Sequence, residues 1–72
     1  MSRPLRDTFV GARKRAGLSQ DAVADAMGTT ASAVSRLEAG LDGKGPSPTL
    51  ATLMRYAEAC GMELNVDLHA TA

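Results

Sequence analysis

Apolar side chains recur every three or four positions along most of this 72-residue chain, the spacing that places residues on one face of an α-helix. Four such runs predict helices at about residues 5–16, 20–27, 30–39 and 48–60, within a single domain spanning residues 1–72. The residues expected to face inward are Leu5, Phe9, Ala12, Ala16, Ala22, Val23, Ala26, Met27, Ala33, Val34, Leu37, Leu50, Leu53, Met54, Ala57 and Cys60. The pattern predicts an all-α fold.

Residues typical of helix ends mark several boundaries. Ser19 can cap the second helix and Thr29 or Thr30 the third, because a side-chain oxygen there accepts a hydrogen bond from an unpaired backbone N–H. Ser47 followed by Pro48 predicts the start of the fourth helix, since proline is favoured at the first helical position. Glycines stand where the four runs end, at Gly17, Gly28, Gly40 and Gly61.

The C-terminal segment has a different period. Met62, Leu64, Val66 and Leu68 alternate with polar residues, which predicts a half-buried β-strand over about residues 62–68. The chain has no second strand-like run, so the strand would need a partner from another subunit. The alternative is an extended tail whose apolar residues pack on the fourth helix.

The second and third predicted helices are joined by about three residues, a connection typical of a helix-turn-helix. Ala24 is small where the third helix would cross close to the second. Gly28 can adopt the positive φ that such a turn requires. Val34 and Leu37 would anchor the inner side of the third helix and leave its outer side exposed.

These residues resemble the Cro/C1-type (XRE) helix-turn-helix repressors, and the resemblance covers roughly residues 5–68. It is carried by Gly17-Leu18-Ser19-Gln20, Val23-Ala24, Met27-Gly28, Val34-Ser35-Arg36-Leu37-Glu38 and Gly40. A later run is similar to the small antitoxin members of the family: Pro48-Thr49-Leu50, Leu53, Arg55-Tyr56-Ala57-Glu58-Ala59, Gly61 and Glu63-Leu64. The resemblance implies a lambda-repressor-like domain of four to five helices. A strand in place of a further helix favours the antitoxin branch, in which some members pair subunits through such a strand.

The family's geometry implies that the third helix enters the major groove of DNA while the second crosses the backbone. Arg36 can then make a bidentate contact to guanine, whereas Ala31 can touch only a thymine methyl group. Direct readout would be limited, which leaves a share of the specificity to DNA shape. The expected DNA contacts are Ser19, Gln20, Thr30, Ala31, Ser32, Ser35, Arg36 and Lys44, of which Ser19, Gln20 and Lys44 are placed for phosphates.

The resemblance also assigns a structural ion pair. In the family, the residues that match Arg13 and Glu38 pair with one another and tie the first helix to the third. Met62, Leu64, Val66 and Leu68 are the expected dimerisation residues.

Composition adds a charge asymmetry. The chain has eight basic and eight acidic side chains, and a net charge of zero gives no indication of a nucleic-acid partner. Residues 1–15, however, carry five basic side chains against one acidic, while residues 16–72 carry three against seven. The basic groups are concentrated on the predicted first helix and its N-terminal arm.

Several classes of protein are disfavoured. The single Cys60 can form neither an internal disulfide nor a cysteine-rich metal site, and its position in an apolar run is typical of a core residue. We expect no metal, no cofactor and no membrane span, and a cytoplasmic location. The chain offers no constellation of catalytic residues, so an enzyme is not expected.

The sequence therefore predicts a homodimeric, sequence-specific transcriptional repressor that binds a palindromic operator in double-stranded DNA. The antitoxin-like features predict that it represses its own operon, with a cognate toxin protein as a further candidate partner. Two alternatives remain: a protein-interaction module that keeps the fold but does not read DNA, and a stand-alone or phage-type repressor without a toxin.

Overall fold

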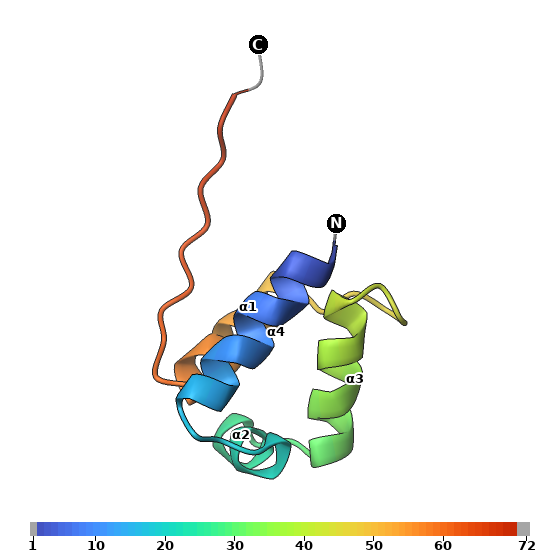
Figure 1. Ribbon diagram of the computed structural model, residues 1–72, viewed down its shortest axis with the longest axis vertical. Helices are drawn as coiled ribbons and strands as arrows, with labels where there is room; N and C mark the ends of the chain where they lie inside the picture. The colour runs from blue at the N-terminus through green and yellow to red at the C-terminus, as the bar shows by residue number, and fades with distance from the viewer. Residues whose placement is uncertain (1, 71–72) are drawn as a thin grey trace.

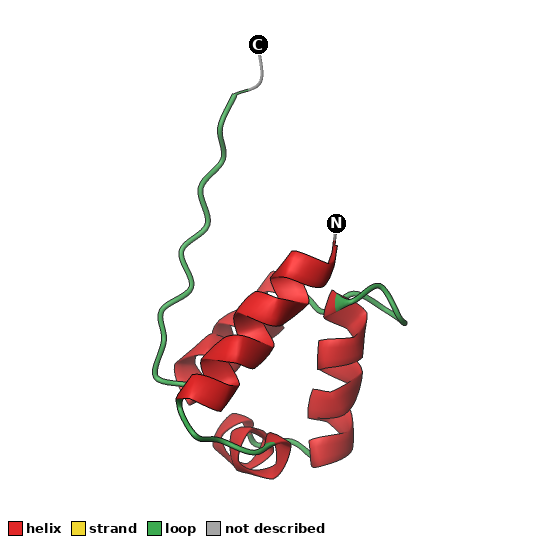
Figure 2. Ribbon diagram, viewed as in Figure 1, coloured by secondary structure: helices red, strands yellow, loops and turns green. Residues whose placement is uncertain are grey.

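The computed structural model describes the backbone of residues 2–70 and the side chains of residues 5–70. This part of the chain forms four helices and no strand, which confirms the all-α prediction (Figures 1 and 2). The helices are α1 (Ser2–Arg15), α2 (Gln20–Met27), α3 (Ala31–Leu41) and α4 (Leu50–Ala59). α1 and α4 lie side by side, and α2 packs on both α3 and α4 at one end of the molecule.

The caps of α2 and α3 are the predicted ones. Ser19 Oγ accepts a hydrogen bond from the Ala22 N–H, and Thr30 Oγ1 accepts one from the Ala33 N–H, each at 3.1 Å. Between the two helices Gly28 has a φ of 70°, a left-handed conformation that residues with a Cβ adopt at a cost. The tight turn of the helix-turn-helix is therefore formed as the sequence predicts.

The predicted start of α4 is wrong. Thr49, not Ser47, is the N-cap, and its hydroxyl accepts from the Thr52 N–H at 3.2 Å. Pro48 packs beside Gly40 and stays outside the helix, and Thr49 offers the same kind of capping hydroxyl two residues after Ser47. The end of α3 also differs, because the helix continues through Gly40 to Leu41.

The core lies where the four helices meet. Its largest members are Phe9 of α1 and Tyr56 of α4, whose rings pack edge to face with centroids 5.7 Å apart. The buried apolar residues are Phe9, Val10, Val23, Ala24, Val34, Leu37, Leu41, Tyr56, Ala57 and Cys60. Leu5, Ala16, Ala26, Leu50 and Met54, which the spacing placed inside, are exposed. Leu5, Ala26, Leu50 and Met54 lie on helix surfaces that no other described helix covers, and Ala16 lies in the turn after α1.

Gly40 allows α3 to pack closely against the loop that follows it. A Cβ built at this position would overlap the carbonyl oxygen of Pro46 and lie 3.1 Å from Cδ of Pro48. Because backbone cannot move aside as a side-chain tip can, we expect Gly40→Ala to lower the free energy of unfolding by about 1–3 kcal/mol.

Urea denaturation followed by circular dichroism measures this effect. Gly11→Ala is the matched control, because its Cβ would meet only the flexible end of Arg15 and alanine is favoured over glycine inside a helix. Equal stability of Gly40→Ala and the wild-type chain would show that the loop is not packed as described.

The tail departs from the predicted strand. In the described chain residues 62–70 are extended but form no strand, and no backbone hydrogen bond reaches residues 63–70. Leu64 is half-buried against the core, whereas Met62, Val66 and Leu68 are 47, 59 and 95% exposed. Packing on α4 is thus limited to the start of the tail, because the rest of it leads away from the helices (Figure 1).

Candidate nucleic-acid interface

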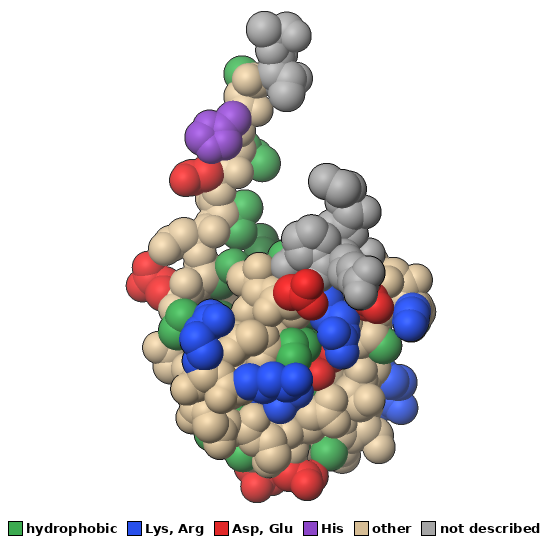
Figure 3. Space-filling view, in the orientation of Figure 1, with side chains coloured by type: hydrophobic (Ala, Val, Ile, Leu, Met, Phe, Trp, Pro, Cys, Tyr) green, Lys and Arg blue, Asp and Glu red, His purple; other side chains and the backbone are tan. Residues whose placement is uncertain are grey.

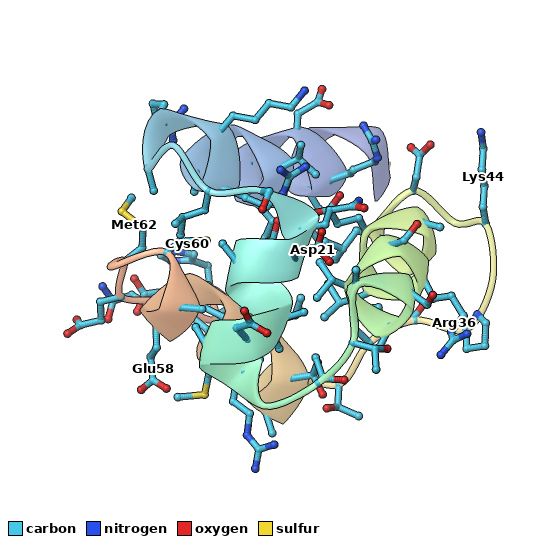
Figure 4. The ribbon with its side chains drawn as sticks, turned by 90° about the horizontal axis from the view of Figure 1, so that it is seen from below. Asp21, Arg36, Lys44, Glu58, Cys60 and Met62 are labelled. Atoms are coloured by element: carbon cyan, nitrogen blue, oxygen red, sulfur yellow. The ribbon has the colours of Figure 1, made fainter. Side chains whose placement is uncertain are left out.

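The outer face of α3 presents the side chains that the sequence singled out. Ser32, Ser35 and Arg36 are exposed, and Ala31 is half-buried at the first turn. Arg36 and Lys44 lie on the α3 side of the molecule, away from Cys60 and the start of the tail (Figure 4). Among the described residues, no ion pair engages the Arg36 guanidinium.

The two cap hydroxyls lie at the N-terminal ends of the helix pair. Ser19 and Thr30 are both exposed, and each accepts a hydrogen bond from its own helix. A hydroxyl that accepts from the backbone retains its own hydrogen for donation. Both side chains can therefore cap a helix and donate to a phosphate oxygen at the same time.

The inner face of α3 is held by a buried carboxylate. Glu38 is 3% exposed, and its Oε2 accepts from Arg13 Nε at 2.8 Å and from the Tyr56 hydroxyl at 2.6 Å. Its Oε1 accepts from Gln20 Nε2 at 3.0 Å and from Arg13 Nη2 at 3.4 Å. We call Arg13, Gln20, Glu38 and Tyr56 the Glu38 cluster. It joins all four helices at one point, and the structure places Arg13 and Glu38 together as the resemblance implied.

The pKa values of the cluster reflect this arrangement. Burial alone would raise the pKa of Glu38, but hydrogen bonds from Tyr56, Arg13 and Gln20, with the charge of Arg13, bring it below its usual value. The hydrogen bond to Glu38 raises the pKa of Arg13. Burial and the neighbouring carboxylate raise the pKa of Tyr56. Glu38 and Arg13 are therefore charged at neutral pH, while the Tyr56 hydroxyl keeps its proton.

Gln20 has a role that sequence reasoning missed. Its amide nitrogen donates to Glu38, so the side chain that was expected at a phosphate completes the buried cluster. The amide carries a second N–H, and a phosphate contact through that hydrogen stays a prediction. The spacing within α2 gave no signal for this contact, because the partner lies on another helix.

Shallow hollows flank α3 on two sides. One, of about 240 Å³, is lined by residues that include Arg6, Ser35 and Lys44. The other, of about 550 Å³, is lined by residues that include Arg36 and Arg55. Each hollow thus carries two basic side chains, and the first is also lined by the carboxylates of Glu38 and Asp42.

Arg6 and Arg55 were not among the expected site residues. Arg6 lies seven residues before Arg13 and hence on the same face of α1. Since the resemblance implied that Arg13 faces α3, the sequence could have indicated that Arg6 lies near α3 as well. Lys44 lies 3.9 Å from the carboxylate of the half-buried Asp42. Because the Lys44 side chain is exposed, this long ion pair contributes little to stability.

Comparison with known proteins agrees with this geometry. A family model described as helix-turn-helix matches residues 12–66, which spans α2, the turn, α3 and α4. The chain belongs to the Cro/C1-type (XRE) helix-turn-helix family. Comparison with curated proteins and with solved structures finds no significant match.

Membership of the XRE family makes the helix pair a DNA-binding element of a transcription regulator. The surface charge of this family member is compatible with that partner. Lys and Arg side chains gather over α1 and along the α3 edge, with some Asp and Glu side chains among them, and further acidic side chains lie at the α2 end and beside the tail (Figure 3). Arg3, which contributes to the basic N-terminal end, lies outside the side chains that the structure describes.

The described part of this XRE-family chain holds no cluster of three or more potential metal-binding side chains. None of its described helices combines the length and the apolarity that a membrane span requires. Cys60 is buried, and burial raises the pKa of its thiol. It is a core residue at the end of α4.

Proposed function

We propose that this protein is a sequence-specific transcriptional repressor that places the N-terminal half of α3 in the major groove of its operator. The observation that carries the proposal is the division of α3 into two faces. The inner face is fixed by the Glu38 cluster and the core, and the outer face presents Ser32, Ser35 and Arg36 to solvent.

The surroundings of α3 support a second layer of contacts. Basic side chains lie in the hollows on both sides of the helix, where the phosphate backbones that border a major groove would pass. Such contacts position a protein on DNA without reading its sequence. Arg6, Lys44 and Arg55 are assigned to this role, with Arg36 as the reader of a guanine edge.

The repressor acts as a homodimer in this proposal. Two recognition helices of a dimer meet half-sites about one helical turn apart, which makes the operator palindromic. Direct readout by one α3 is limited, because Ala31 offers only a methyl group. A second copy doubles the number of base contacts and supplies the specificity that one domain lacks.

Binding to the DNA upstream of its own reading frame tests the proposal. A gel shift should give a complex that persists against excess unrelated DNA, and its affinity should fall steeply with added salt because phosphate contacts release counterions. Nuclease footprinting should then protect two symmetric half-sites. A protein that shifts no DNA, or shifts all sequences equally, would be an interaction module and not a repressor.

An antitoxin role is the finer candidate within this function. It is favoured by the extended tail, which stands where larger repressor domains of the family would continue with a helix, and by the apolar side chains that the tail exposes. Co-expression with the product of the neighbouring reading frame tests it. Rescue of growth from a toxic neighbour would support an antitoxin, and a harmless neighbour would leave a stand-alone repressor.

A further inference from the structure

The tail has two chemically different faces. Its apolar side chains lie on the side turned toward the helices, and its acidic and His side chains lie on the other (Figure 3). The apolar face consists of Met62, Leu64, Val66 and Leu68, and the polar face of Glu63, Asn65, Asp67 and His69. Its backbone from residue 63 to residue 70 has no hydrogen-bond partner in the described chain. Such an extended segment exposes the same unpaired N–H and C=O groups as the edge strand of a sheet.

A second copy of this chain can satisfy that edge only in certain registers. Residues directly opposite one another in an antiparallel pair lie on the same face of the sheet. A two-fold axis that passes between two residues would set apolar side chains opposite polar ones. Parallel pairing would bring Glu63 and Asp67 beside their own copies. The axis must therefore pass through a residue of an antiparallel pair.

Charge removes two of the remaining registers. An axis through Asn65 sets Glu63 opposite Asp67 of the second copy, and does so twice in the dimer. An axis through Asp67 sets that carboxylate opposite itself. Like charges directly opposite each other destabilise a strand pair.

The length of the extended segment decides among the registers that are left, whose axes pass through Leu64, Val66 or Leu68. Gly61 has a φ of 72°, so the extended backbone begins only at Met62. An axis through Leu64 can then pair residues 62–66 alone and leaves Leu68 uncovered. An axis through Leu68 pairs residues 66–70 of the described chain and leaves Met62 and Leu64 uncovered. An axis through Val66 pairs every residue from 62 to 70.

We propose that two copies of this chain pair their tails as antiparallel strands with the two-fold axis at Val66. On the polar face, Glu63 then lies opposite His69 of the second copy, and Asn65 lies opposite Asp67. Each carboxylate thus faces a hydrogen-bond donor. On the apolar face Val66 meets its own copy and Leu64 meets Leu68.

This inference rests on the homodimer of the proposed function and specifies which atoms hold it together. The paired strands would cover Leu68, the most exposed of the large apolar side chains. The ladder would also satisfy backbone groups that a single chain leaves to solvent.

Single substitutions to cysteine, with the native Cys60 retained, test the register in the full-length protein under mild oxidation. In Val66→Cys the two Cα atoms would lie about 5 Å apart, within the range of about 4.4–6.8 Å that a disulfide spans. In Asn65→Cys the two copies would be offset by two residues, about 7 Å along the strand, and in Leu64→Cys by four, about 13 Å. We expect a covalent dimer from Val66→Cys and monomers from the other two variants.

Two controls complete the experiment. The wild-type chain reports on Cys60, which is buried and should not cross-link. A mixture of Leu64→Cys and Leu68→Cys chains should give a covalent heterodimer, because those positions face each other, although Leu64→Cys alone gives none.

The outcomes separate the register from the function. Preferential cross-linking of Asn65→Cys or Leu64→Cys would overturn the Val66 register while the dimer stands. The absence of every cross-link, with a monomeric mass by light scattering, would overturn tail pairing altogether. A gel shift of the wild-type chain on the same day shows separately whether DNA binding, and with it the proposed function, survives.

Discussion

Glu38→Ala is expected to lower the free energy of unfolding by about 3–5 kcal/mol, because it leaves a buried charge without its partner. The Arg13 guanidinium would lose its carboxylate, and the buried Tyr56 hydroxyl would lose the acceptor that lies 2.6 Å away. Globular domains have only about 5–15 kcal/mol of stability in total. The variant should therefore lose a large share of its stability, which thermal and urea denaturation followed by circular dichroism will measure.

Glu58→Ala is the matched control for this substitution. It removes the same kind of side chain from an exposed position on α4. Substitutions at such positions usually change stability by no more than about 0.5 kcal/mol. If Glu38→Ala and Glu58→Ala had the same small effect, the Glu38 cluster would not hold the helices together.

The Glu38 carboxylate also predicts that the stability of the domain depends on pH. The pKa of Glu38 is lower in the folded chain than its ordinary value of 4.5, so its contribution to stability is complete above that value. The contribution is lost as the pH falls through the folded pKa. The reason is that the Glu38 carboxylate binds a proton more readily in the unfolded chain than in the folded one, so acid favours unfolding. Glu38→Gln removes the titrating group. We expect the stability advantage of the wild-type chain over this variant to shrink as the pH falls below 4.5.

Arg36→Ala is expected to cost about 1–3 kcal/mol of sequence-specific DNA binding and to relax the preference at one base pair. This corresponds to a dissociation constant for the operator that is roughly 5- to 150-fold larger. The physical reason is that a guanidinium can donate two hydrogen bonds to the edge of one guanine. Fluorescence anisotropy with the operator and with single-base variants of it measures both changes.

Lys44→Ala is the companion variant, because Lys44 is exposed beside the same helix but is assigned to a phosphate. It should weaken binding to all sequences alike and reduce the slope of affinity against salt concentration by about 1. Urea denaturation should show both variants as stable as the wild-type chain. If Arg36→Ala instead behaved like Lys44→Ala, a different side chain would read the base.

The helical part of the fold was predictable because its signals are local. Caps at Ser19 and Thr30, the left-handed Gly28 and the apolar spacing of α2 each depend on residues within one turn. The start of α4 could not be predicted in this way. Ser47 and Thr49 are equivalent N-cap residues by sequence, and only the packing of Pro48 beside Gly40 decides which of them caps the helix. The exposed Leu50 and Met54 show the same limit, since spacing identifies an apolar face but not what covers it.

The site divides in a similar way. The outward residues of α3 followed from the helix-turn-helix spacing, and Arg13 with Glu38 followed from the family resemblance. The part that Gln20 and Tyr56 play in the cluster depends on how four helices meet, which no single stretch of sequence records. For the tail, alternation predicts an extended backbone, but a strand also needs a neighbour, and one chain does not provide it.

The Glu38 cluster also bears on how this domain can change. Glu38 fixes the orientation of α3 from its inner side, with partners on α1, α2 and α4. Positions 31, 32, 35 and 36 contribute nothing to that anchorage. Under the proposed function, their side chains can therefore be exchanged for other polar residues without moving the helix. We expect that such substitutions, made one at a time, would direct this scaffold to other DNA sequences.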